Sequence, residues 1–61
     1  MTAIVERITP DTNDSIKIHF KIEKTKFGYD LIDQITNQIQ YHVREIEPQF
    51  LCDNDYLIEV K

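Results

Sequence analysis

Residues 15–24 constrain the fold more than any other part of the chain, because apolar and polar side chains alternate along them without a break. The apolar positions are Ile16, Ile18, Phe20 and Ile22, and lysines, a histidine and a glutamate fill the positions between and after them. A period of two predicts a strand that is buried on one face and solvated on the other. A helix would scatter these four side chains around its circumference, so the chain must contain a sheet with one covered face.

Two further strands are expected near the ends of the chain. Residues 2–9 are short and rich in β-branched side chains, and Pro10 ends this run because it lacks a backbone donor. Near the other end Tyr56, Ile58 and Val60 alternate with their neighbours, after a turn-like segment at residues 53–55.

The middle of the chain changes period and predicts one amphipathic helix. Apolar residues recur there at steps of three and four, at Leu31, Ile32, Ile35, Ile39, Val43 and Ile46. Asp30 is a candidate N-cap, Asp33 complements the helix dipole in the first turn, and Pro48 ends the helix near residue 47. Because isoleucine is not a strong helix former, burial of the apolar stripe has to supply most of the helix's stability.

These segments predict a single α+β domain over residues 1–61. Its fold is a small antiparallel or mixed three-stranded sheet with one helix on one face, in the order β-β-α-β. An alternative stays open, in which residues 49–52 form a short fourth strand and the order becomes ββαββ, as in β-grasp folds.

The register of the first strand also stays open. Pairing Ile8 with Ile16 places Ile4 and Ile8 against the core. A slip of one residue leaves both isoleucines on the open face beside His19 and turns Arg7 toward the core edge. In that case the open face carries an apolar patch that needs a cover.

A domain of 61 residues usually needs support beyond its own core, because chains of this size bury only about 60% of the surface that the unfolded form exposes. Cys52 is the only cysteine, which excludes an internal disulfide, and His19 and His42 lack the spacing of metal ligands. We therefore expect no metal site, and a homodimer or a complex with a larger protein as the remaining source of support.

The residues offer little for catalysis. Gly28 is the only glycine, so no glycine-rich phosphate loop can form. Ser15 is the only serine and lies in the predicted hairpin turn, while Cys52 stands close to carboxylates that do not activate a thiol. We expect a protein that is not an enzyme and that holds no cofactor.

The location of the protein can also be predicted. Its first residues lack a basic region followed by a long apolar core, and no stretch approaches the roughly 20 apolar residues that cross a bilayer. A lone cysteine agrees with a reducing compartment. The sequence therefore predicts a cytoplasmic protein without membrane contact.

Two surfaces are candidates for binding. The outer row of the predicted helix is uncharged in its middle, which suits a protein interface; with the open face of the first strand it gives the candidate interface residues Ile4, Ile8, Gln34, Asn37, Gln38 and Tyr41. The second surface is basic and could contact phosphates; it comprises Lys17, His19, Lys21, Lys24 and Lys26. No exposed aromatic side chains are expected among these lysines to stack on bases.

A net charge of −4 argues against general nucleic-acid binding. The sequence therefore favours a small non-catalytic protein-interaction or regulatory module, such as an accessory subunit or an inhibitor, that self-associates. The alternative is a nucleic-acid-binding protein that uses the basic strand face, and a small enzyme comes third.

Overall fold

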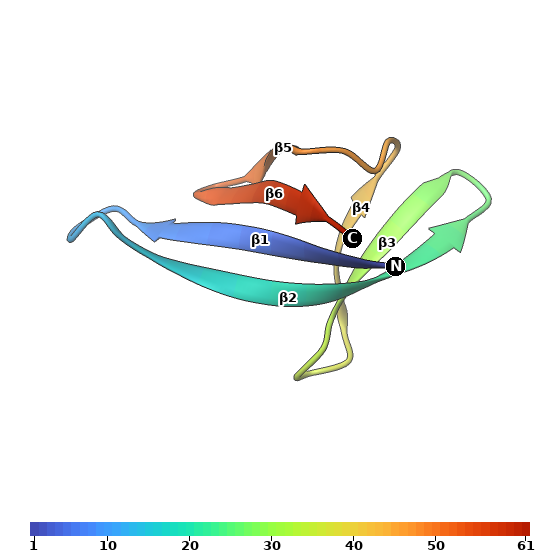
Figure 1. The fold of residues 1–61 in the computed structure, drawn as a ribbon, viewed down its shortest axis with the longest axis horizontal. Helices are drawn as coiled ribbons and strands as arrows, with labels where there is room; N and C mark the ends of the chain where they lie inside the picture. The colour runs from blue at the N-terminus through green and yellow to red at the C-terminus, as the bar shows by residue number, and fades with distance from the viewer.

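The computed structural model describes the whole chain as a single sheet of six strands without any helix, and hence without a helix that could span a membrane. The strands are β1 (Thr2–Thr9), β2 (Asp14–Thr25), β3 (Gly28–Asp33), β4 (Ile39–Val43), β5 (Gln49–Cys52) and β6 (Asp55–Val60). All neighbours are antiparallel, in the order β4-β3-β2-β1-β6-β5. The sheet curls, so that β3 and β4 cross the direction of β1 and β2 (Figure 1).

The curl follows from the length of β2, which has 12 residues and changes partner along its course. It pairs with β1 from Asp14 to Lys21 and with β3 from Phe20 to Thr25. The two pairings overlap only at Phe20 and Lys21, so β2 connects two parts of the sheet that twist relative to each other. The sheet therefore curls over its own inner face, and the core lies there without a helix to cover it.

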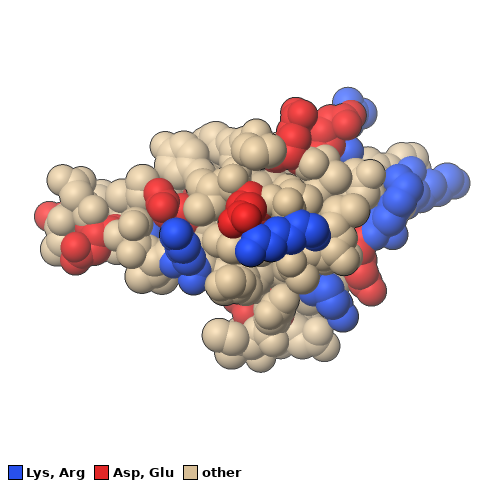
Figure 2. Space-filling view, in the orientation of Figure 1, with Lys and Arg blue, Asp and Glu red and all other residues tan.

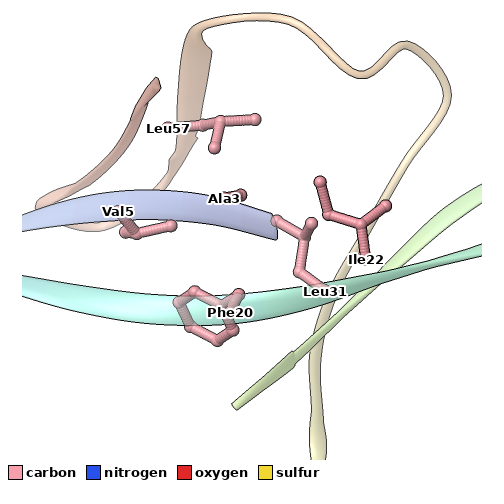
Figure 3. Close-up of a cluster of buried hydrophobic side chains, with 6 residues drawn as sticks. All are labelled: Ala3, Val5, Phe20, Ile22, Leu31 and Leu57. Atoms are coloured by element: carbon pink, nitrogen blue, oxygen red, sulfur yellow. The ribbon is translucent and has the colours of Figure 1, made fainter. Parts of the chain in front are cut away.

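The core lies on this inner face. It contains six buried side chains from four strands, shown in Figure 3: Ala3, Val5, Phe20, Ile22, Leu31 and Leu57. Those from β1 and β2 stand two residues apart, as the period of a strand requires. The alternation of residues 15–24 therefore predicted the buried face of β2 correctly at Phe20 and Ile22, which are buried, and at Ile18, which packs against the core.

The predicted helix, and with it the α+β fold with a three-stranded sheet, is wrong. Its residues form β3, a turn, β4 and a loop, and Ile35 from the predicted buried stripe is 92% exposed. The Asp33 carboxylate accepts hydrogen bonds from the N–H groups of Ile35 and Thr36 at 2.8 and 3.3 Å, and Asn37 has φ 60°. The chain therefore turns back after residue 36, and the β-branched residues on either side pair as strands.

Because the structure contains no helix, both predicted orders, β-β-α-β and ββαββ, are wrong. The strands at residues 2–9 and 15–24 and the last strand are confirmed, and residues 49–52 form the short strand of the alternative. In the structure the second half of β2, from Phe20 to Thr25, pairs with β3, and β3 includes the first residues of the predicted helix.

The register of β1 differs from both alternatives considered above. The side chains of β1 nevertheless lie on the faces that the second alternative, the slipped pairing, predicts. Ala3 pairs with Phe20 and Val5 with Ile18, a shift of two residues from the slipped pairing, and an even shift leaves every side chain on the same face. Ile4 accordingly lies opposite His19 on the outer face.

The sheet stays open between β4 and β5, and we call this opening the seam. Both strands are sheet edges, although they follow each other in the chain and only residues 44–48 connect them. The seam is bridged by side chains, because the hydroxyl of Tyr41 on β4 donates to Asp55 on β6 and the Cys52 thiol on β5 donates to the Tyr41 oxygen at 3.6 Å.

The two ends of the chain meet in the middle of the sheet, where β1 and β6 are neighbours (Figure 1). The N–H of Thr2 donates to the carbonyl of Lys61 at 3.0 Å, and the N–H of Lys61 donates to the carbonyl of Thr2 at 2.8 Å.

Candidate functional site

The outer face of the β5–β6 hairpin exposes large apolar side chains. Phe50 and Tyr56 are direct cross-strand partners, and their rings meet edge to face with centroids 5.2 Å apart. Phe50 is 56% exposed and Tyr56 40% exposed, and Ile58 follows on β6 at 38%. We call Phe50, Tyr56 and Ile58 the β5–β6 patch. An aromatic pair of this kind presents contact area in a fixed arrangement.

The predicted interface residues Ile4 and Ile8 lie on the next strand, β1, and both are half-buried. Ile4 stands opposite Glu59 of β6, and the N–H of Ile8 donates to the carbonyl of Asn54 at 3.0 Å. The outer face of β1 therefore continues the surface of the β5–β6 hairpin. The structure brings these two isoleucines close to the hairpin that carries the β5–β6 patch.

A cluster of polar side chains holds the hairpin from the inner face. Arg7 on β1 donates to both oxygens of Asp55, with Nε at 2.8 Å from Oδ1 and Nη2 at 2.9 Å from Oδ2. Tyr41 on β4 donates to the same carboxylate. Asp55 is only 4% exposed. We call Arg7, Tyr41 and Asp55 the clamp, because they connect three strands, two of them on opposite sides of the seam.

The electrostatics of the clamp favour one fixed protonation state. The hydrogen bonds from the Arg7 guanidinium hold the pKa of Asp55 below its ordinary value, although burial acts in the opposite direction. Burial, reinforced by the bond to Asp55, raises the pKa of Tyr41, and the bond to Asp55 raises the pKa of Arg7. At neutral pH the carboxylate is charged and both donors keep their protons, so the clamp is suited to holding strands and not to exchanging protons.

A pocket of about 320 Å³ opens beside the clamp. Its lining comprises Arg7, Ile8, Thr9, Pro10, Tyr41, Asp53, Asn54 and Asp55. Because Arg7 and Asp55 bind each other in a bidentate pair, neither presents an unpaired charge to a ligand. No three His, Cys, Asp or Glu side chains lie close enough together to share a metal ion.

The residues predicted on the outer row of a helix do not share a surface. Gln34, Asn37 and Gln38 are exposed around the β3–β4 turn, where the carbonyl of Gln38 accepts from the N–H of Asp33 at 2.9 Å. Tyr41 instead points to the inner face, where its ring packs edge to face on Phe20 with centroids 6.1 Å apart. The structure therefore separates Tyr41 from the three amides.

The residues of the predicted basic surface lie in two separate places. Lys17, His19 and Lys21 are exposed on the outer face of β2, with Glu6 directly opposite Lys17. The other two lysines lie at the β2–β3 hairpin, Lys24 with its Nζ 4.8 Å from the Tyr29 ring centroid and Lys26 with its Nζ 5.7 Å from that of Phe27. Figure 2 shows basic side chains gathered over this end of the molecule and acidic ones over the β1–β2 turn at the other.

Sequence reasoning missed the β5–β6 patch and the clamp. The patch depended on residues 49–52 being a strand, which places Phe50 on the same face as Tyr56. The clamp joins Arg7 to a residue 48 positions away. Its only local signal was a charged residue on the inner face of the first strand.

The β5–β6 patch and the clamp that holds its hairpin are thus the features of the molecule that suggest a function. Comparison of the chain with protein-family models, with curated proteins and with solved structures finds no match.

Proposed function

We propose that the protein is a small non-catalytic interaction module of the cytoplasm that binds a protein partner through the outer face of the β5–β6 hairpin. The observation that carries the proposal is the β5–β6 patch, two aromatic rings and an isoleucine exposed together on one face. Aromatic side chains are enriched at protein interfaces and dominate their binding energy. An accessory subunit or an inhibitor would act through such a surface.

The clamp supports this role because it fixes the hairpin that carries the patch. Asp55 precedes Tyr56 directly in β6, and its carboxylate is tied to β1 through Arg7 and to β4 through Tyr41. A patch on a rigid element loses little conformational entropy when it binds.

The thin core supports association as well. Only ten residues of the chain are buried, and the curled sheet has a single small cluster at its centre. A partner that binds the folded state adds its binding free energy to the stability of the fold. Association with a second copy or a larger protein therefore gives such a chain the support that its core lacks.

Nucleic-acid binding is the second candidate function, favoured by the exposed Lys17, His19 and Lys21 on the same outer face of the sheet as the aromatic pair. Glu6 lies between these groups, however, since it pairs with Lys17 on one side and with Tyr56 on the other. A carboxylate at that position repels a phosphate backbone, so the protein partner is the better fit.

Affinity-tagged protein purified from its own cells tests the proposal. A defined protein partner, which includes an untagged second copy, should be lost from the Phe50→Ser variant. It should be retained by Phe27→Ser, which removes a 76% exposed phenylalanine from the β2–β3 turn and serves as the matched control. Equal retention by both variants would show that the patch is not the binding surface.

The nucleic-acid alternative has its own test. Retention on a phosphate-rich column that disappears in the double variant Lys17→Glu, Lys21→Glu would support it. If retention is unchanged and the Phe50→Ser variant has lost its protein partner, the interaction module stands.

A further inference from the structure

The first half of β2 has a neighbouring strand on one side only. β2 pairs with β1 from Asp14 to Lys21, but its pairing with β3 begins only at Phe20. β3 ends at Asp33, the residue opposite Phe20, because the chain turns away there into the β3–β4 turn. Residues 14–19 therefore form a free edge of the sheet, which we call the β2 edge.

One hydrogen bond shows which backbone groups face the open side. The carbonyl of His19 accepts from the N–H of Gln34 at 3.4 Å, so the backbone groups of His19 point away from β1. Backbone groups alternate between the two sides of a strand, and those of Ser15 and Lys17 therefore point the same way. No strand lies there to pair with them. Unpaired backbone groups of this kind are a template for an added strand.

A pocket of about 390 Å³ lies along the β2 edge. Its lining comprises Ile16, Lys17, Ile18, His19, Gln34 and Ile35. The strand edge forms one wall and the β3–β4 turn, which projects past β2 in Figure 1, forms the other. Ile16 is 55% exposed, and Ile35 on the turn is among the most exposed apolar residues of the molecule. An apolar side chain placed between these walls would cover isoleucines that the fold leaves in water.

The outer-face side chains along this edge are basic. Lys17 and His19 alternate with the isoleucines, and Lys21 continues their row. Neither lysine forms an ion pair within the chain. Glu6 faces Lys17 from β1, on the side away from the free edge. An added strand would lie about 5 Å from β2 and about 10 Å from β1, so Lys17 would act on it more strongly than Glu6 does.

We propose that the β2 edge binds, as an additional strand, an extended protein segment whose side chains alternate between apolar and acidic. The backbone of the segment pairs with that of Ser15 and Lys17. Its apolar side chains fill the pocket between Ile16 and Ile35, and its carboxylates lie beside Lys17 and His19. Strand addition of this kind takes its affinity from the backbone and its specificity from alternate side chains.

The charge of the edge selects this occupant. A second copy of the chain, paired through its own β2 edge, would place lysine and histidine beside lysine and histidine. Nucleic acid supplies the negative charge but no apolar side chains for the pocket. The edge is short, so the contact is smaller than a standard interface and the dissociation constant is on the order of 100 μM. β1 and β6 separate the β2 edge from β5, so this surface goes beyond the one in the proposed function.

A blocked peptide of alternating glutamate and valine, as long as the β2 edge, is the probe. Its binding to the whole protein can be followed by fluorescence anisotropy at physiological ionic strength. A lysine–valine peptide and a peptide with the same glutamates and valines in two blocks should each bind about tenfold more weakly. No binding of the alternating peptide at millimolar protein, or equal binding of the block peptide, overturns the proposal.

Methylation of the peptide's backbone nitrogens tests the strand pairing itself. Alternate N–H groups of a strand point to opposite sides, so only one set faces β2. One peptide is methylated on every glutamate nitrogen and another on every valine nitrogen. One of them should bind like the unmodified peptide and the other about tenfold more weakly, because it has lost its donors to β2. The glutamate set faces β2 in an antiparallel pairing and the valine set in a parallel one. Equal affinities of the two peptides contradict strand addition.

Two variants place the peptide on the protein. Lys17→Glu should weaken binding about fivefold, whereas Lys26→Glu makes the same change of charge at the β2–β3 turn and should have no effect. Ile35→Ser should also weaken binding about fivefold, and Phe27→Ser, again in the β2–β3 turn, should not. All four side chains are exposed, so the fold should tolerate each change. A control that weakens binding as much as its variant rules out this site.

The outcomes separate the inference from the proposed function. Phe50→Ser should leave peptide binding unchanged, because Phe50 lies on β5. Capture of a protein partner through Phe50 without peptide binding overturns the inference and leaves the proposed function intact, and peptide binding without that capture does the reverse. An oligodeoxythymidylate that binds more tightly than the peptide, and loses affinity in Lys17→Glu, overturns strand addition in favour of nucleic acid.

Discussion

Replacing Arg7 with methionine tests whether the clamp holds the sheet together. Asp55 is 4% exposed and accepts two of its three side-chain hydrogen bonds from Arg7. Removing one partner of a fully buried ion pair costs about 3–5 kcal/mol, but the Arg7 side chain is 46% exposed and water screens the pair. We therefore expect a loss of about 2 kcal/mol, while methionine keeps most of the apolar stem.

A loss of this size is large for so small a domain, whose free energy of unfolding is of the order of 3–9 kcal/mol. The melting temperature should fall by about 8–16 °C. Urea unfolding can be followed by circular dichroism or by tyrosine fluorescence, since the chain has 3 tyrosines and no tryptophan. Arg44→Met is the control, because Arg44 is exposed and forms no ion pair, and it should change stability by less than about 0.5 kcal/mol.

The difference between the wild type and Arg7→Met should also depend on pH. The pKa of Asp55 is lowered in the folded state from its ordinary value of 3.8, so its contribution is present above pH 3.8 and is lost as the pH falls through the folded pKa. In the Arg7→Met variant the guanidinium no longer lowers the pKa of Asp55, so burial of the carboxyl group raises it relative to the wild type. The stability difference should therefore be largest at neutral pH and shrink in acid.

Two results would refute the reasoning about the clamp. One is an Arg7→Met variant as stable at neutral pH as the Arg44→Met control. The other is a stability difference that stays constant between neutral pH and pH 3, because the charge of Asp55 would then contribute nothing.

Three further substitutions test individual contacts, each by urea unfolding. Gly28→Ala should cost more than about 2 kcal/mol, because Gly28 has φ 152° and a Cβ there would collide with the carbonyl oxygen of Val43; a smaller loss would contradict that close approach. Asp33→Ala should cost about 1 kcal/mol by removing the acceptor of the β3–β4 turn, and an unchanged stability would mean that the turn does not depend on it. Tyr41→Phe should cost about 1 kcal/mol by removing one donor from the Asp55 carboxylate while keeping the ring, and a stability equal to the wild type would show that water replaces the hydroxyl.

The strands that sequence reasoning found are those whose signals are local. Residues 15–24 alternate over their whole length, and Pro10 and the turn-forming residues after it end the first strand. The second half of β2 shows the limit of such signals, since alternation cannot reveal that the strand exchanges one partner for another at Phe20 and Lys21.

The helix was predicted wrongly because steps of three and four residues also arise when two short strands flank a tight turn. Ile32 and Ile39 are seven residues apart, which is helical spacing, but in the structure they are partners across β3 and β4. The deciding signals were the Asp33 side chain, which holds the turn, and Asn37 with its positive φ. A carboxylate that accepts from N–H groups two and three residues later is common to helix starts and turns, so the motif alone did not separate them.

The candidate site needed information that no local pattern carries. One of the two registers left open for the first strand placed Arg7 on the inner face. Its partner Asp55, however, was interpreted as a turn residue. Which strand lies beside β1 depends on the last segment of the chain inserting between β1 and β5, and this is a property of the whole fold. The β5–β6 patch could not be predicted without that arrangement, because it depends on the pairing of β5 with β6.

The meeting of the two chain ends inside the sheet has a consequence for how the molecule could be rewired. Each neighbour in the sheet except β1 and β6 is also a neighbour in sequence, and the ends of those two strands already exchange a pair of hydrogen bonds at Thr2 and Lys61. A circular permutant joined there and cut within residues 44–48 would form a simple meander in which every strand follows its neighbour. Its mean contact separation would be lower, so it should fold faster into the same sheet.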